Sequence, residues 1–198
     1  MPGSQRERML SGEIYDSRDP ELLALAHRAR ALLAAFTALP STDGVARERT
    51  VRQLLGHVGA RVWIEPPFFC DYGQHITIGE DSFVNLNCVF LDAAPIRIGA
   101  QVLIGPGVQL LTVSHPVQTS ERIVSPEERR PDQAPYRTFA RPIVIGDRAW
   151  IGAGCIVLPG VTIGANAVIG ACSLVTTDIP PDCLAFGQPC RVQRELGP

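Results

Sequence analysis

The stretch IGDRAWIGAGCIVLPGVTIGANAVIGACSLVTTDIP, residues 145–180, decides the fold because it consists of consecutive six-residue units. Each unit opens with an aliphatic residue, and a small or aliphatic residue follows four places later. An amphipathic helix repeats every 3.6 residues and a β-strand every two, so neither predicts a period of six. A parallel β-helix does, because three such units make one turn of a triangular prism and their two recurring side chains fill its interior.

The same six-residue period covers residues 78–95 and 98–115, with a two-residue slip at Ile96–Arg97, and it fits residues 60–77 more loosely. Glycine usually follows the opening residue, and we expect it there because a sharp corner resists residues with side chains. The expected interior positions four places after each opening residue are Ser82, Cys88, Val102, Val108, Ala149, Cys155, Val161, Ala167 and Ser173.

The amino-terminal part of the chain has a different sequence pattern, without six-residue repeats. Residues 20–39 are rich in leucine and other good helix formers, with Pro20 suited to the first helical turn and Asp19 to its cap. A second helix is expected from Ser41–Asp43 to about Leu55, ended by Gly56 or Gly59. We therefore divide the chain into a helical segment, 1–59, and a β-helix domain, 60–198.

Composition narrows the class of protein. Hydrophobic residues make up 45% of the 198 and charged residues 19%, as in a folded globular chain. The net charge of -2 gives no reason to expect a nucleic acid or an anionic membrane as partner. No signal peptide or membrane-length apolar run is present, so we expect a cytoplasmic protein. All 18 basic residues are arginine, which excludes Schiff-base chemistry on a lysine.

The six cysteines are expected to be reduced, since nothing indicates secretion. Their spacing matches neither a CxxC metal site nor a redox pair. Cys70, Cys88 and Cys155 fall at positions where the repeat requires a small apolar residue, so we interpret them as packing residues.

The repeat is interrupted after His115 by a polar insertion, residues 116–142. His115 ends the last regular unit, and Pro116 biases it toward an extended conformation. A neutral imidazole suits general-base catalysis near neutral pH, but on the residues alone a histidine in this place is more often a solvated loop residue. The other histidines are His27 and His57, expected in the helical segment, and His75, expected to make a surface hydrogen bond in a turn.

Several motifs together resemble the sugar O-acetyltransferases of the maltose and galactoside type. They are MLSGEIYDSRDPELLALAHRAR (9–30), PPFFCDYGQHITIGEDSFVNLNCVFLD (66–92), SHP (114–116), WIGAGCIVLPGVTIG (150–164) and IPPDCLAFGQPCRV (179–192). The repeats alone specify only the superfamily of hexapeptide-repeat acyltransferases, whereas their combination with SHP and the amino-terminal motif is more specific. The resemblance implies a left-handed β-helix, a homotrimer with active sites between subunits, and acetyl-coenzyme A as donor.

The resemblance also implies roles for individual residues. His115 is identified as the general base, Asn85 as a residue that organises the reacting groups, and Ala153 as a backbone donor near the thioester carbonyl. We infer direct attack within a ternary complex, with no covalent role for cysteine or serine. The residues implied to bind coenzyme A are Ala153, Ala171, Thr176, Thr177, Arg191 and Arg194. Thr177 departs from the pattern, which usually has lysine there.

On the acceptor side, the resemblance implies that Asp71, Asn85 and Asp92 face the sugar, with Asp16 as a weaker candidate. Carboxylates pair well with sugar hydroxyls. The pattern's second aspartate after Asp92 is Ala93 here, which leaves the identity of the acceptor open.

Three alternatives stay open on the sequence. The first is a hexapeptide acetyltransferase for a non-sugar small molecule, which would share His115 and coenzyme A. The second is a trimeric β-helix carbonic anhydrase with interfacial zinc, but this needs three suitably placed histidines and the β region has only His75 and His115, so no metal is expected. The third is a scaffold without catalysis.

Overall fold

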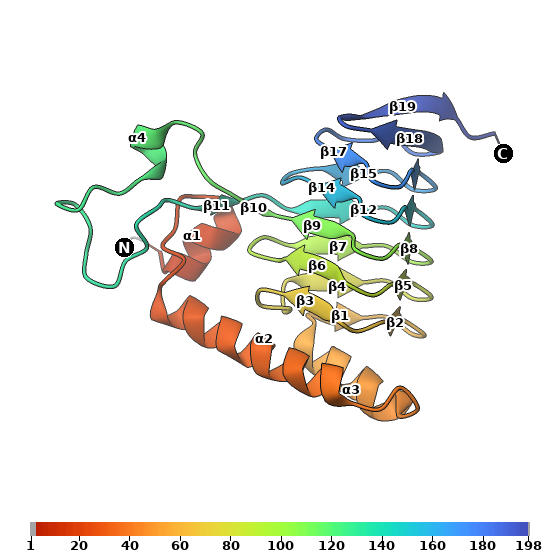
Figure 1. Cartoon of the computed structure of the whole chain (residues 1–198), viewed down its shortest axis with the longest axis horizontal. Helices are drawn as coiled ribbons and strands as arrows, with labels where there is room; N and C mark the ends of the chain where they lie inside the picture. Colours follow the sequence, from red (N-terminus) through yellow and green to blue (C-terminus); the bar gives the residue numbers. More distant parts are fainter. Residues whose placement is uncertain (1–2, 198) are drawn as a thin grey trace.

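The computed structural model describes residues 3–197; residues 1–2 and 198, the extreme ends of the two segments predicted above, lie outside the described residues. The chain forms a triangular prism of stacked coils, with helices at one end and a strand hairpin at the other (Figure 1). The predicted parallel β-helix is confirmed.

The prism has three faces, each a sheet of parallel strands from successive coils. Face 1 contains β1 (His57–Val58), β4 (Ile76–Ile78), β7 (Ile96–Ile98), β12 (Ile143–Ile145) and β15 (Thr162–Ile163). Face 2 contains β2 (Trp63–Ile64), β5 (Phe83–Val84), β8 (Leu103–Ile104), β13 (Trp150–Ile151), β16 (Val168–Ile169) and β18 (Cys183–Gly187), with β19 (Cys190–Glu195) antiparallel at its end. Face 3 contains β3 (Phe68–Cys70), β6 (Cys88–Leu91), β9 (Gln109–Leu111), β14 (Ile156–Val157) and β17 (Leu174–Val175).

The interior of the prism is filled as the repeat predicts. The aliphatic or aromatic residues that open the units are buried: Ile78, Val84, Phe90, Ile98, Ile104, Leu110, Ile145, Ile151, Val157, Ile163, Ile169 and Val175. The nine residues four places further along are buried too. Cys70, Cys88 and Cys155 are among the buried free thiols, in agreement with their expected packing role.

The glycines that follow the opening residues are needed for a different reason from the one we expected. Gly79 and Gly152 do not adopt positive φ values. A Cβ at Gly79 would lie 2.5 Å from the Ala100 nitrogen, and one at Gly152 would lie 2.6 Å from the Ala171 nitrogen. Close approach of the next coil's backbone, and not corner conformation, therefore selects glycine.

One corner of the prism, between faces 3 and 1, differs from the other two. In the carboxy-terminal coils the partner of Trp150 is Val168, three six-residue units later. In the earlier coils the partner of Phe83 is Leu103, so each of these coils is two residues longer than three six-residue units. The two additional residues lie at this corner. The insertion after β9 leaves the prism at the same corner.

The helices cover the start of the prism and part of its side. They are α1 (Gln5–Ser11), α2 (Pro20–Ala38), α3 (Gly44–Leu54) and the short α4 (Thr119–Arg122). Asp19 caps α2 as predicted, and α3 begins after Asp43, which accepts a hydrogen bond from the Ala46 N–H. Helix α1 was not predicted. His57, which we placed in the helical segment, belongs to β1 and pairs with β4.

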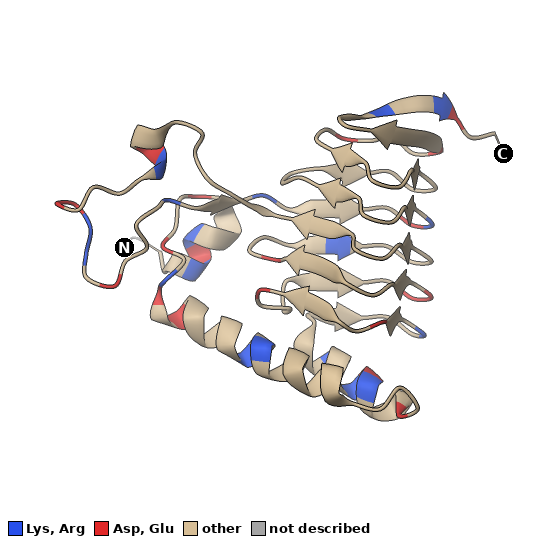
Figure 2. Cartoon of the chain, viewed as in Figure 1, with Lys and Arg blue, Asp and Glu red and all other residues tan. Residues whose placement is uncertain are grey.

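The insertion extends away from the prism and returns beside α1 (Figure 1). The strand that precedes it, β10 (Val113–Ser114), pairs antiparallel with β11 (Phe139–Ala140) near its end. Charged residues gather on the helices, on the insertion and along the prism's corners, and the strands themselves are largely uncharged (Figure 2). Within residues 3–197, no helix is both long and apolar enough to cross a membrane.

Candidate active site

His115 lies where the chain leaves the prism, directly after β10. Its Nδ1 lies 2.9 Å from the carbonyl oxygen of Arg137, on the returning part of the insertion. Its ring packs edge-on against the ring of Tyr136, with 5.3 Å between the centroids. Because a carbonyl oxygen can only accept a hydrogen bond, Nδ1 carries the proton, and in the neutral imidazole the lone pair is on Nε2. Nε2 is therefore the atom able to take a proton.

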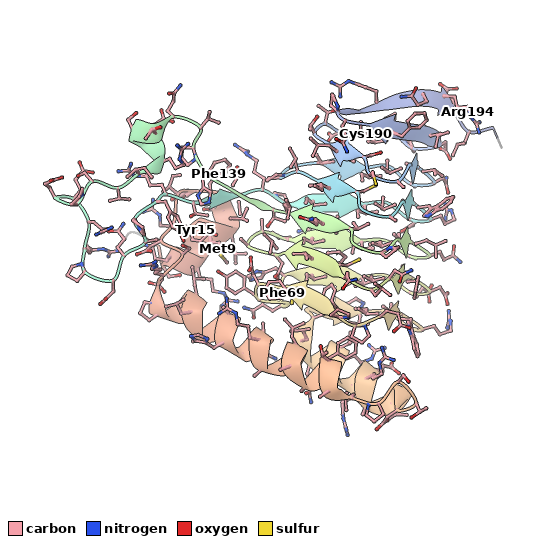
Figure 3. The ribbon with its side chains drawn as sticks, viewed as in Figure 1. Met9, Tyr15, Phe69, Phe139, Cys190 and Arg194 are labelled. Atoms are coloured by element: carbon pink, nitrogen blue, oxygen red, sulfur yellow. The ribbon has the colours of Figure 1, made fainter. Side chains whose placement is uncertain are left out.

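A pocket of about 350 Å³ lies beside His115. Its walls come from the amino-terminal segment, α2, the corner after β3 and the insertion. The polar lining residues other than His115 are Tyr15, Ser17, Arg30, Asp71, Tyr72, Tyr136 and Thr138. Tyr15 lies between the insertion and the helices (Figure 3). The pocket thus joins parts of the chain that are far apart in sequence.

Asp71 is the acidic residue of this pocket. Burial raises the pKa of its carboxyl from 3.8 to about 6, and the negative charge of Asp92 adds to this rise. The guanidinium of Arg30 acts in the opposite direction and lowers that pKa. Asp71 therefore changes from a hydrogen-bond donor and acceptor to an acceptor alone near pH 6.

The raised pKa predicts how Asp71 affects stability. Between about pH 4 and pH 6 the folded chain binds a proton at Asp71 that the unfolded chain has released, so the free energy of unfolding falls as pH rises through this range. Asp71→Asn lacks this titration. We expect its stability relative to the original protein to increase between pH 4.5 and pH 7, measured by urea unfolding of both proteins at each pH. A difference independent of pH would contradict the assignment.

Asp92 does not face the pocket, contrary to our expectation from the resemblance. It is 0% exposed. Its carboxylate accepts hydrogen bonds from the Tyr72 N–H at 2.8 Å and the His75 N–H at 3.3 Å. The His75 ring is also buried, and its Nδ1–H donates to the Asp92 carbonyl oxygen at 2.7 Å, so this histidine makes no surface hydrogen bond. Both residues hold the stacked corner together.

A second hollow, of about 590 Å³, runs along face 2 and its edge. Asn85, Ala153 and Ala171 line it, together with mainly apolar residues of β5, β8 and β13. Within the described residues, the N–H groups of Ala153 and Ala171 donate to no acceptor. Free backbone donors beside an apolar channel suit a long flexible ligand with amide and thioester carbonyl groups.

The remaining residues predicted to bind the coenzyme lie further along the prism. Thr176 and Thr177 follow β17, and Arg191 and Arg194 belong to β19, where both arginines are exposed. Arg194 lies near the carboxy-terminal end of the hairpin (Figure 3). None of the four lines the hollow that contains Ala153.

Within one chain, Asn85 and His115 line different hollows. Asp16 lines neither of these hollows. Its carboxylate accepts hydrogen bonds from the insertion, from the Ala134 N–H and the Arg130 guanidinium. A single chain therefore assembles His115 with Asp71 but not with Asn85.

Several residues around His115 were not predicted from the sequence. Tyr136 and the Arg137 carbonyl lie in the irregular insertion, where no periodic pattern indicates their place. Arg30 could have been found, because it lies one turn after Ala26 on the side of α2 that faces the prism. No cluster of three or more His, Cys, Asp or Glu side chains suited to a metal ion occurs in residues 3–197.

Comparisons with known proteins agree with this architecture. Residues 8–59 match the maltose acetyltransferase hexapeptide capping motif, and residues 142–177 match the bacterial transferase hexapeptide family. The galactoside O-acetyltransferase of Escherichia coli strain K12 is 37% identical over 190 residues, which cover 96% of this chain and 88% of that protein.

Solved structures are similar over the whole chain. The maltose O-acetyltransferase of Clostridium difficile 630 has a TM-score of 0.91 and 38% identity, and the match covers 100% of both chains. A hexapeptide-repeat acetyltransferase of Vibrio cholerae, solved in complex with acetyl-coenzyme A, has a TM-score of 0.85 and 40% identity, covering 99% of this chain and 100% of that one.

The fold and the matched motifs define a hexapeptide-repeat acyltransferase. More narrowly, the chain belongs to the acetyltransferase family of the maltose and galactoside O-acetyltransferases.

Proposed function

We propose that the protein transfers an acetyl group from acetyl-coenzyme A to a hydroxyl group of a sugar, with His115 as general base. The observation that carries the proposal is the hydrogen bond from His115 Nδ1 to the Arg137 carbonyl, which fixes the tautomer and leaves Nε2 unprotonated beside a polar pocket. As the acceptor oxygen attacks the thioester carbon, its proton passes to Nε2. The C–S bond of the resulting tetrahedral intermediate then breaks, and the thiolate of coenzyme A leaves and takes the proton from Nε2 of His115.

The hollow on face 2 is the proposed channel for acetyl-coenzyme A. The acetyl-coenzyme A complex of the Vibrio cholerae relative supports this donor, and so does the pair of free N–H groups at Ala153 and Ala171. The Ala153 N–H would stabilise the negative charge that develops on the thioester oxygen. We assign Thr176, Thr177, Arg191 and Arg194 to the distal part of the coenzyme, where the arginines would pair with phosphate.

We propose that the active protein is a homotrimer with each site between two subunits. Large apolar side chains are exposed on the strands of face 2, and they form a surface that a second subunit would cover. They are Trp63, Leu103, Trp150 and Phe186. A neighbour packed there would bring its His115 toward this chain's Asn85 and channel, a combination that a single chain does not make.

The acceptor would bind in the pocket beside His115, where Asp71 and the tyrosine hydroxyls offer partners for sugar hydroxyls. Ala93 stands in place of the pattern's second aspartate, so this position offers no carboxylate to an acceptor. A non-sugar alcohol is therefore the second candidate acceptor. Location in the cytoplasm remains a prediction from the sequence.

An acceptor screen tests the proposed function. Release of free thiol from acetyl-coenzyme A would be followed with maltose, glucose, galactosides and simple non-sugar alcohols as acceptors. We expect turnover with at least one sugar and loss of that turnover in His115→Ala. Turnover with non-sugar alcohols alone would identify the alternative, and failure to bind acetyl-coenzyme A in calorimetry would contradict both.

A further inference from the structure

The returning part of the insertion, residues 134–140, supplies the two groups that orient His115. The carbonyl of Arg137 accepts from His115 Nδ1 at 2.9 Å, and the ring of Tyr136 packs against the imidazole. The insertion itself contains no strand apart from β11 at its end and no helix longer than α4. Within the insertion the segment is held by hydrogen bonds from the Arg137 N–H to the Arg122 carbonyl at 2.7 Å and from the Val124 N–H to the Pro135 carbonyl at 3.1 Å. The insertion is in turn held in place from outside.

Asp16 provides that hold from the amino-terminal segment. One of its carboxylate oxygens accepts from the Ala134 N–H at 3.1 Å and from the Arg18 N–H at 3.0 Å. The other oxygen lies 3.3 Å from Nη2 of Arg130. The Asp16 side chain is only 8% exposed, although the Arg130 side chain is 67% exposed. Both oxygens of the Asp16 carboxylate thus accept hydrogen bonds from the insertion, and the side chain is largely buried.

Tyr15, which precedes Asp16, makes a second contact with the insertion. The Tyr15 N–H donates to the Thr138 carbonyl at 3.0 Å. Residues 15 and 16 therefore hold the insertion at Ala134 and at Thr138, on both sides of Tyr136 and Arg137. The backbone between two such fixed points has little freedom to turn its carbonyl away from His115.

We propose that Asp16 is a positioning residue that keeps the Arg137 carbonyl in place and so fixes the tautomer and orientation of His115. It does so without contacting the reacting atoms. This differs from the direct contact with the acceptor that the family resemblance implied for Asp16. The proposal rests on the proposed function, in which His115 is the base, for its effect on catalysis.

Asp16→Ala tests the proposal. We expect kcat to fall by about 10- to 100-fold, the effect of a misplaced catalytic group, while the KM for the acceptor stays unchanged. Asp16→Asn keeps an oxygen that can accept from the Ala134 N–H, so it should recover most of the lost kcat. Glu127→Ala, in the same insertion but exposed, is the matched control and should retain full activity.

Nuclear magnetic resonance of the histidine side chains gives a readout that a general loss of stability would not produce. In the original protein we expect a slowly exchanging Nδ1 proton on His115, identified by its absence in His115→Ala, and we expect Asp16→Ala to lose this signal with the Nδ1 proton of His75 retained. An acceptor KM raised in Asp16→Ala at unchanged kcat, or an unchanged His115 signal, would overturn the positioning role. Because the signal does not depend on turnover, it separates failure of this proposal from failure of the proposed function.

Discussion

His115→Ala is expected to lower kcat by about 10²- to 10⁴-fold, because that is the usual contribution of a general base to a proton-transfer step. Nε2 of His115 is the available basic atom beside the pocket, since Nδ1 donates to the Arg137 carbonyl. The dissociation constant of acetyl-coenzyme A should not change, because the groups assigned to its binding are the Ala153 and Ala171 N–H groups and not the His115 ring. The oligomeric state should not change either, because the proposed interface rests on the apolar side chains of face 2. Thiol release at saturating acceptor measures the effect.

His27→Ala is the matched control for this experiment. His27 is exposed on α2, and we expect its alanine variant to keep full activity. If His115→Ala were as active as His27→Ala, the assignment of the general base would be wrong. A loss of activity accompanied by dissociation of the trimer would instead indicate a structural role.

The second large effect is expected from the double variant Leu103→Asp and Trp150→Asp. These side chains are 50% and 53% exposed on face 2, and in the proposed trimer they are covered by a neighbour. Two unpaired carboxylates in each interface would each cost several kcal/mol on burial, so we expect the subunits to dissociate. Light scattering should then give one chain of 21.4 kDa instead of three, and activity should be lost.

Val117→Asp controls for the introduction of a charge at an exposed apolar residue. Val117 is 89% exposed on the insertion and lies outside face 2, so this variant should remain a trimer. A double variant on face 2 that stays trimeric would contradict the proposed interface. The activity measurement alone would not, because Leu103 and Trp150 also line the proposed coenzyme channel.

The six-residue period predicted the prism and its interior because each of those positions is set by local repetition. The side chains at Ser82 and Cys155, for example, point inward for the same reason as their counterparts in every other coil. The helix α1 could also have been predicted, since Ser4 and Glu7 form a capping box that is readable as Ser-x-x-Glu.

The surroundings of His115 could not be predicted in the same way. The insertion is held by contacts between distant residues, such as the hydrogen bond from Ala134 to Asp16, 118 positions apart. A contact between such distant residues leaves no periodic pattern in the sequence. The burial of Asp92 was hidden for a related reason, because it depends on how the corner after β6 stacks on the corner after β3. The sequence therefore predicts where the site lies along the chain, but it does not predict which residues surround His115.

In the proposed trimer, each active site combines His115 of one subunit with Asn85 of the next. Mixed trimers of His115→Ala and Asn85→Ala chains test it most directly, isolated with a different affinity tag on each chain. Each variant alone should be nearly inactive. Every mixed trimer, whether two-to-one or one-to-two, would contain one interface with both native residues, so we predict about one third of the original activity per trimer. Mixed trimers as inactive as the two parents would place both residues in the same subunit's site and contradict a site shared between subunits.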